Sequence, residues 1–194
     1  MNRLETALRQ AAADLKRFGR PWALVGGFAV SARATPRFTR DLDIAVAVDD
    51  DSHAEELVRG LFADGYSLFG TIEHDNGRLA TVRLRRNVRN LDVIVDLLFA
   101  SSGIEPEIAQ AAESIEIVPG LTLPVATTGH LIALKLLARD DATRPQDLAD
   151  LRALILVASP NDLAMAEAAV RLIMERGFNR ERDLISALQE FRAM

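Results

Sequence analysis

Two aspartates interrupt an apolar run near residue 40, and their type and spacing are suited to binding a cation. The stretch reads "DLDIAVAV" and begins with Asp41, Leu42, Asp43 and Ile44. Side chains of a strand alternate between its two faces, so both carboxylates point the same way, with Cα atoms roughly 6.6 Å apart. Two carboxylates this close repel each other, and burying them without a positive partner is unfavourable. The pattern therefore predicts a positive group between Asp41 and Asp43.

A third carboxylate for the same site lies in the run "LDVIVDLLF", residues 91–99. Asp92 and Asp96 share one face of this predicted strand. Asp96 is the better candidate because apolar residues flank it on both sides, as they flank Asp43. Asp92 lies nearer the turn at 87–90 and is the alternative.

The composition favours oxygen ligands for this site, because the chain has no cysteine and three histidines. Oxygen donors are typical of Mg²⁺ or Mn²⁺ sites. We expect Asp41, Asp43 and Asp96 to hold two such ions. The competing interpretation is that Asp41 only enters the strand beside Arg40, and that Asp43 is the partner of a salt bridge.

A glycine pair, Gly26 and Gly27, ends the short apolar run "WALV" and precedes a helix predicted to begin at Phe28. Because glycine has no Cβ, its backbone amide can approach a phosphate closely, and a helix N-terminus attracts negative charge. We therefore expect this pair to allow the close approach of a phosphate. Tight packing between strand and helix would explain the pair equally well.

The elements that must position these residues are short strands rich in apolar and β-branched residues. We predict such strands at 22–25, 41–48 and 91–99. Two further strand-like runs flank Asn76–Gly77, which is a strong signal for a hairpin turn. The three aspartates should therefore lie on strands of one sheet, beside the glycine turn.

The second part of the chain reads as helical. Ser159, followed by Pro160, is an expected helix N-cap, and so is Asn179. The pattern predicts an α/β fold in which a small mixed sheet flanked by helices occupies residues 1–125. A C-terminal helical lobe is expected at 126–194.

Composition limits the class of protein. With 194 residues, 49% of them hydrophobic, the chain can build a substantial core, and the absence of cysteine excludes disulfides and cysteine nucleophiles. We expect a cytoplasmic protein with no membrane segment, because no apolar run reaches about 18 residues and "MNRLETALRQ" lacks the apolar part of a signal peptide. The net charge of −5 argues against general nucleic-acid coating, but two acid-free, arginine-rich stretches, 31–40 and 78–90, border the aspartates.

Several motifs together resemble a known family. Val25-Gly26-Gly27 followed by Asp41-Leu42-Asp43-Ile44 resembles the nucleotidyltransferase superfamily typified by DNA polymerase β. "RFTRDLDI" is similar to the R-x-T-x-D-x-D motif of the AbiEii/MenA-like group, the toxins of type IV toxin–antitoxin and abortive-infection systems. "VDLLFASSGIE" and "LIALKLLARDDATRPQDLADL" resemble that group's third-carboxylate strand and its later lysine and aspartate motifs.

The resemblance, which covers roughly residues 20–155, implies the nucleotidyltransferase fold and a reaction that moves NMP from an NTP to a hydroxyl acceptor. Two metal ions would serve the reaction, and Arg37 or Arg40 would neutralise the pyrophosphate leaving group. Gln146 stands where the group usually has a lysine, and Asp150 is an alternative to Asp147. By the resemblance, the phosphate contacts are Gly26 and Gly27, the metal ligands are Asp41, Asp43 and Asp96, the nucleotide contact is Lys135, and Asp147 completes the site.

The acceptor is left open by the sequence. In the resembled toxins it can be a tRNA end, and the arginines of 78–90 could cradle tRNA or other RNA. Related families modify small molecules such as aminoglycosides, or hydroxyls on proteins. The resemblance also implies a cognate antitoxin as partner. The alternative function is a catalytically silent nucleotide-binding or regulatory module that acts through a protein partner.

Overall fold

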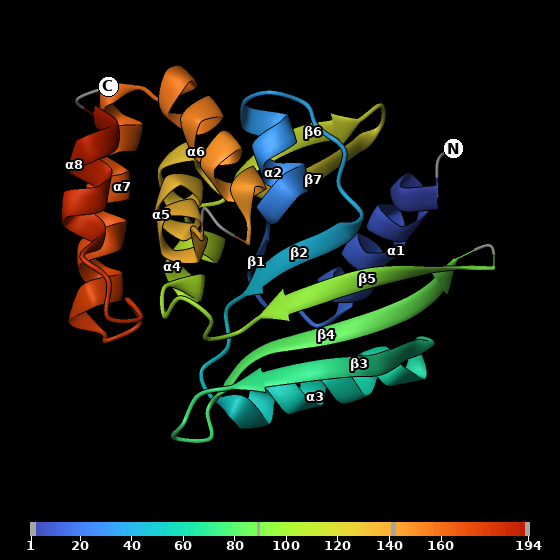
Figure 1. Cartoon of the computed structure of the whole chain (residues 1–194). Coiled ribbons are helices and arrows are strands. Elements are labelled where there is room, and N and C mark those ends of the chain that lie inside the picture. Colours follow the sequence, from blue (N-terminus) through green and yellow to red (C-terminus); the bar gives the residue numbers. More distant parts are fainter. Residues whose placement is uncertain (1–2, 89, 141–142, 193–194) are drawn as a thin grey trace.

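A seven-stranded mixed sheet runs through the computed structural model, which describes residues 3–88, 90–140 and 143–192 (Figure 1). The order of strands across the sheet is β3-β4-β5-β2-β1-β7-β6. The strands are β1 (Trp22–Val25), β2 (Asp41–Val46), β3 (Tyr66–Glu73), β4 (Leu79–Val88), β5 (Leu91–Leu98), β6 (Glu113–Val118) and β7 (Leu121–Val125).

The two aspartate-bearing strands are direct neighbours. β2 and β5 run parallel, with the Cα atoms of Asp43 and Asp96 paired in register. β1 and β7 also pair in parallel, and the other neighbouring strands are antiparallel. The parallel register places the third carboxylate beside the first two, on adjacent strands.

Helices flank the sheet, as the sequence predicts. α1 and α3 pack against β4, α3 also packs against β3, and α2 lies between the sheet and α5 and α6 (Figure 1). In the view of Figure 1, α5, α6, α7 and α8 gather on the side of the sheet where α2 lies. The helices are α1 (Arg3–Arg17), α2 (Gly26–Arg33), α3 (Asp51–Ala63), α4 (Glu105–Gln110), α5 (Thr128–Ala138), α6 (Pro145–Val157), α7 (Pro160–Glu175) and α8 (Leu184–Arg192).

This architecture confirms the predicted α/β fold with a mixed sheet. Among the described residues, every strand lies between 22 and 125, and α5 to α8 follow from residue 128 onward. A division into lobes at 1–125 and 126–194 stays a prediction.

Burial follows the alternation expected for β2. Leu42 and Ile44 are buried in the main hydrophobic core, whereas Asp41 and Asp43 on the opposite face are only half-buried. Burying each of these apolar side chains contributes about 1.5–3 kcal/mol of hydrophobic free energy. The core therefore fixes the orientation of the strand, and with it the direction of both carboxylates.

Two helix ends differ from expectation, and one agrees. α2 begins at Gly26, two residues before Phe28. Ser159 is the N-cap of α7, with Pro160 at the start of the helix, as predicted. Asn179 is not an N-cap: α8 begins at Leu184, after a loop in which Arg180 and Glu181 have φ of 53° and 59°.

A carboxylate explains the later start of α8. The Ser186 amide donates to Asp183 Oδ1 at 3.0 Å, which is the contact that a capping side chain makes in the first helical turn. The prediction at Asn179 was wrong because Asp183 supplies that acceptor closer to the apolar stretch. As for membranes, the parts of the chain that the structure describes hold no helix with the length and apolarity to span a bilayer.

Candidate active site

One cavity of about 840 Å³ brings together most of the residues selected from the sequence. Its lining comes from the start of β2, the end of β5, parts of β3 and β4, the start of α2, and helices α5 and α6. Arg40 is not among the lining residues, and its guanidinium lies 5.8 Å from the ring centroid of Phe38. The predicted residues that line the cavity are Gly26, Gly27, Arg37, Asp41, Asp43, Asp96, Lys135 and Asp147.

Asp43 lies at the centre of the electrostatics of this cavity. Burial raises the pKa of its carboxyl to about 6, and the nearby Asp96 carboxylate adds to the rise. Lys135 acts in the opposite direction, and so does the Gly27 amide, which donates a hydrogen bond to the Asp43 carboxylate. Burial, followed by Asp96, also raises the pKa of Asp41. The site therefore holds more negative charge than its surroundings offset.

Asp96 is held by an arginine from the neighbouring strand. Arg83 on β4 pairs with Asp96 across the antiparallel ladder, and its Nε and Nη2 donate to the two carboxylate oxygens at 2.8 and 2.6 Å. The hydrogen bond to Asp96 raises the pKa of Arg83. Sequence reasoning placed Arg83 in an arginine-rich stretch without assigning it to the site, because only the β4–β5 register brings it there.

Asp92, the alternative third carboxylate, lies outside the cavity lining. It accepts a hydrogen bond from Asn87 Nδ2 at 3.0 Å and lies 3.7 Å from Arg85 Nη1. Both Asp92 and Arg85 are exposed. The structure therefore brings Asp96, not Asp92, together with Asp41 and Asp43.

A buried ionic network supports the opposite wall of the cavity. Lys135 Nζ on α5 lies 2.7 Å from Asp147 Oδ1 and 2.8 Å from Asp150 Oδ2, both on α6. Arg37 donates to the same Asp150 carboxylate through Nε at 2.6 Å and Nη2 at 2.8 Å, and Gln146 Nε2 donates to it at 3.0 Å. Lys135 thus contacts both aspartates that the sequence left as alternatives.

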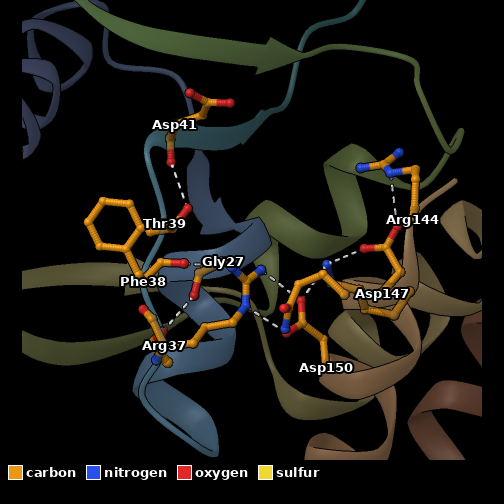
Figure 2. Close-up of polar contacts among 11 residues, drawn as sticks. Gly27, Arg37, Phe38, Thr39, Asp41, Arg144, Asp147 and Asp150 are labelled. Atoms are coloured by element: carbon orange, nitrogen blue, oxygen red, sulfur yellow. Dashed lines mark hydrogen bonds and ion pairs between the residues drawn. The ribbon is translucent and has the colours of Figure 1, made fainter.

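The network fixes the charge state of Asp150 and the path of the preceding loop. Burial opposes ionisation of Asp150, but the hydrogen bonds from Arg37, Lys135 and Gln146 outweigh it and lower the pKa of its carboxyl. Figure 2 shows Arg37 pointing to Asp150 and Arg144 to Asp147, while the Asp41 carboxylate points away from both pairs. The loop between α2 and β2 is therefore anchored to α6 on one side and delivers Asp41 on the other.

Two further arginines at the cavity were missed from the sequence. Arg144 Nε lies 3.1 Å from Asp147 Oδ2, and Arg180 comes from the loop before α8. Burial lowers the pKa of Arg180, and the nearby guanidinium groups of Arg144 and Arg182 lower it further. Repulsion among these cations indicates a place where an anion would be stabilised. The incorrect N-cap at Asn179 placed Arg180 on a helix, so the sequence did not indicate that this residue lies in a loop at the cavity.

The glycine pair has a structural explanation in the described chain. Gly26 has φ of +62°, and a Cβ built there would stand 1.9 Å from Asp43 Oδ2. A Cβ at Gly27 would stand 2.7 Å from Thr39 Oγ1. Both positions therefore require the close approach that only glycine allows, and the partners seen are Asp43 and Thr39. A phosphate contact at this turn stays a prediction.

We expect Gly26→Ala to lower the free energy of unfolding by about 2 kcal/mol or more, because a methyl group adds left-handed backbone strain and displaces Asp43. The measurement is urea denaturation. Gly77→Ala is the matched control: Gly77 has φ of +82° and nothing within 4 Å of the Cβ position, so only the backbone strain applies. Equal losses in the two variants would mean that contact with Asp43 does not restrict Gly26.

The donor set fits a hard divalent cation in type and direction. Asp41, Asp43 and Asp96 face one cavity, and carboxylate oxygens are the ligands that Mg²⁺ and Mn²⁺ prefer. As the side chains stand, the described ranges contain no group of three or more His, Cys, Asp or Glu positioned to hold a metal ion. Arg83 occupies both oxygens of Asp96, so this pair would have to open for all three carboxylates to bind one cation.

Comparisons with known proteins agree with this geometry. Residues 7–194 match the family described as "Nucleotidyl transferase AbiEii toxin, Type IV TA system". Among solved structures, the antibiotic-resistance factor ANT(2'')-Ia aligns with a TM-score of 0.57 at 15% identity, over 97% of this chain and 96% of that one. The lincosamide antibiotic adenylyltransferase LnuA, solved with lincomycin bound, aligns with a TM-score of 0.51 at 14% identity, over 79% and 98%. At these identities the structural likeness shows a shared fold. No curated protein sequence matches the chain.

Proposed function

The chain belongs to the AbiEii nucleotidyltransferase toxin family, and from this premise we propose that it moves a nucleoside monophosphate from an NTP to a hydroxyl acceptor. The observation that supports this most strongly is the convergence of three carboxylates. Asp41, Asp43 and Asp96 line one cavity from two neighbouring parallel strands, beside a glycine turn. An ordinary structural salt bridge would need one of them, not all three.

In this proposal Asp41, Asp43 and Asp96 hold Mg²⁺ or Mn²⁺, which would supply positive charge at the triphosphate and lower the pKa of the acceptor hydroxyl. The acceptor hydroxyl loses its proton to solvent as its oxygen forms a bond to the α-phosphorus, and the bond from that phosphorus to the pyrophosphate oxygen breaks. Lys135 is the nucleotide contact, and Asp147 and Asp150 orient its ammonium group.

Backbone amides and arginines that line the cavity are proposed to receive the phosphates. The N-terminal amides of α2 at Gly26 and Gly27, together with Arg144 and Arg180, line the cavity and would stabilise the pyrophosphate as it leaves. Arg37 is committed to Asp150 through two hydrogen bonds, so we assign it to positioning of the loop.

The acceptor is proposed to lie along the open face of β3, β4 and β5. Arg83 and Arg85 are exposed on this face, and Arg85 lies over the Phe69 ring at 5.9 Å from its centroid. A cationic strand beside an exposed aromatic ring suits an extended polyanion, which supports a tRNA end or other RNA as acceptor. A small molecule or a protein hydroxyl are the other candidates. We further propose the toxin role in a type IV system, with an antitoxin as partner.

The test is to incubate the protein with each α-³²P-labelled NTP and Mg²⁺, offering total RNA, cell extract and aminoglycosides in turn. We expect label from one NTP to appear on an acceptor, most strongly in the RNA fraction. Label on no acceptor under any condition, together with NTP binding in a separate titration, would support the catalytically silent module instead.

A further inference from the structure

The Arg83–Asp96 pair occupies the place where the proposed reaction needs Asp96 to be available. Both oxygens of the Asp96 carboxylate accept from one guanidinium, at 2.8 and 2.6 Å. A fork of this kind takes up the carboxylate edge that would face a cation. Among the acidic residues of the site, Asp96 is the one bound in this way by a strand arginine that also lines the cavity.

The charges around this pair explain why an arginine is held there. Asp96 raises the pKa values of both Asp41 and Asp43, so the three carboxylates repel one another in the substrate-free protein. Lys135 offsets part of this charge but is already engaged by Asp147 and Asp150. Among the described residues, the cation in direct contact with one of the three carboxylates is Arg83, which pairs with Asp96.

We propose that Arg83 is a positioning residue that keeps Asp96 out of metal coordination in the substrate-free protein, and that its guanidinium must leave Asp96 before Asp96 can act as a ligand. The inference rests on the proposed function, since it concerns the same carboxylates. The inference adds that, in the substrate-free protein, the Arg83 side chain blocks Asp96 from binding a metal ion. Metal binding at Asp96 is then coupled to movement of a residue that borders the acceptor face.

Exposure makes this movement feasible for Arg83 and not for Arg37. The Arg83 side chain is 47% exposed, so its guanidinium can turn into solvent on the open face of β4. Arg37 is 23% exposed and bound to an almost fully buried Asp150, so it has no comparable solvated position. Charge acts in the same direction, because a divalent cation placed among the carboxylates would repel Arg83.

The test is to measure Mn²⁺ binding to the nucleotide-free protein by electron paramagnetic resonance, which does not depend on turnover. We expect Arg83→Gln to bind Mn²⁺ about fivefold more tightly than the wild type, the size expected when a partly exposed ion pair no longer competes. Arg83→Lys keeps the charge but loses the fork, so its affinity should lie between the two. It also serves if the glutamine variant does not fold.

Two controls separate the specific effect from a general change of charge. Arg85→Gln removes an arginine two residues away on the same face, outside the cavity lining, and should change Mn²⁺ affinity by less than about twofold. In an Asp96→Asn background, the gain from Arg83→Gln should be clearly smaller, because only the repulsion between the Arg83 charge and the cation is then removed.

Unchanged affinity in both Arg83 variants, or an equal gain in the Asp96→Asn background, would overturn the inference and leave the proposed function standing. Equal Mn²⁺ binding by the wild type and Asp43→Asn would contradict the proposed metal site itself, and the inference with it. Thermal unfolding of each variant confirms that the comparison is between folded proteins.

Discussion

Asp43→Asn is expected to lower NMP transfer by about a thousandfold or more while the chain stays folded. Asparagine has nearly the same shape and can still accept the hydrogen bond from the Gly27 amide. It lacks the negative charge that the proposed reaction requires between Asp41 and Asp96. The measurement is the initial rate of label transfer from the NTP that the wild type uses, at saturating Mg²⁺.

The same substitution should stabilise the metal-free protein. The folded-state pKa of Asp43 is raised to about 6, above the ordinary value of 3.8, so the ionised carboxylate destabilises the fold at neutral pH. Wild-type stability at this position recovers as the pH falls through about 6. We therefore expect Asp43→Asn to be more stable than the wild type by about 1–2 kcal/mol at pH 7.5, with an advantage that shrinks toward pH 5.

Urea denaturation in EDTA at several pH values measures this difference. Asp92→Asn is the matched control, because Asp92 is exposed and outside the cavity lining. It should change neither the transfer rate nor the pH dependence of stability. Unfolding of the Asp43→Asn protein at pH 7.5 would identify Asp43 as a structural salt-bridge partner and contradict the assignment of the site.

Asp150→Ala should have the opposite effect, with a loss of about 3 kcal/mol in the free energy of unfolding. Asp150 is 2% exposed and accepts from Arg37, Gln146 and Lys135. Removing it leaves two cations without this partner in the wall of the cavity. Transfer should also fall, because the loop that delivers Asp41 loses its anchor on α6. Urea denaturation and the label assay measure the two effects.

A control on the surface calibrates the Asp150 result. Asp92→Ala breaks a contact of 3.7 Å to Arg85 between two exposed side chains, so its effect should stay within about 0.5 kcal/mol. If Asp150→Ala is as mild as Asp92→Ala, then Arg37 and Lys135 find other partners, and the network does not hold the cavity wall.

Local patterning was sufficient to predict the carboxylate pair. The alternation of Asp41 and Asp43 with buried Leu42 and Ile44 follows directly from strand geometry, and the structure confirms it. The preference for Asp96 over Asp92 also came from neighbouring residues. Apolar residues flank Asp96 on both sides, as they flank Asp43, whereas Asp92 lies near a turn. Periodicity likewise predicted the strands and the α/β class, and the Ser159–Pro160 pair predicted the N-cap of α7.

The partners of these carboxylates could not be predicted, because they depend on the register between segments. Arg83 meets Asp96 only through the antiparallel pairing of β4 with β5. Arg37 and Asp150 are 113 residues apart in sequence and meet only when α6 packs near the loop after α2. Arg180 reaches the cavity from a loop with positive φ, a conformation that its residue types do not indicate.

In the proposed reaction, the cavity lined by Asp41, Asp43 and Asp96 transfers the nucleoside monophosphate of an NTP to an acceptor. Parallel reactions with α-³²P- and γ-³²P-labelled NTP, run with wild-type protein and with Asp43→Asn, test it most directly. We expect an acceptor to gain α label and no γ label, and only with the wild type. An acceptor that gains γ label, or α label that persists undiminished in Asp43→Asn, would contradict it.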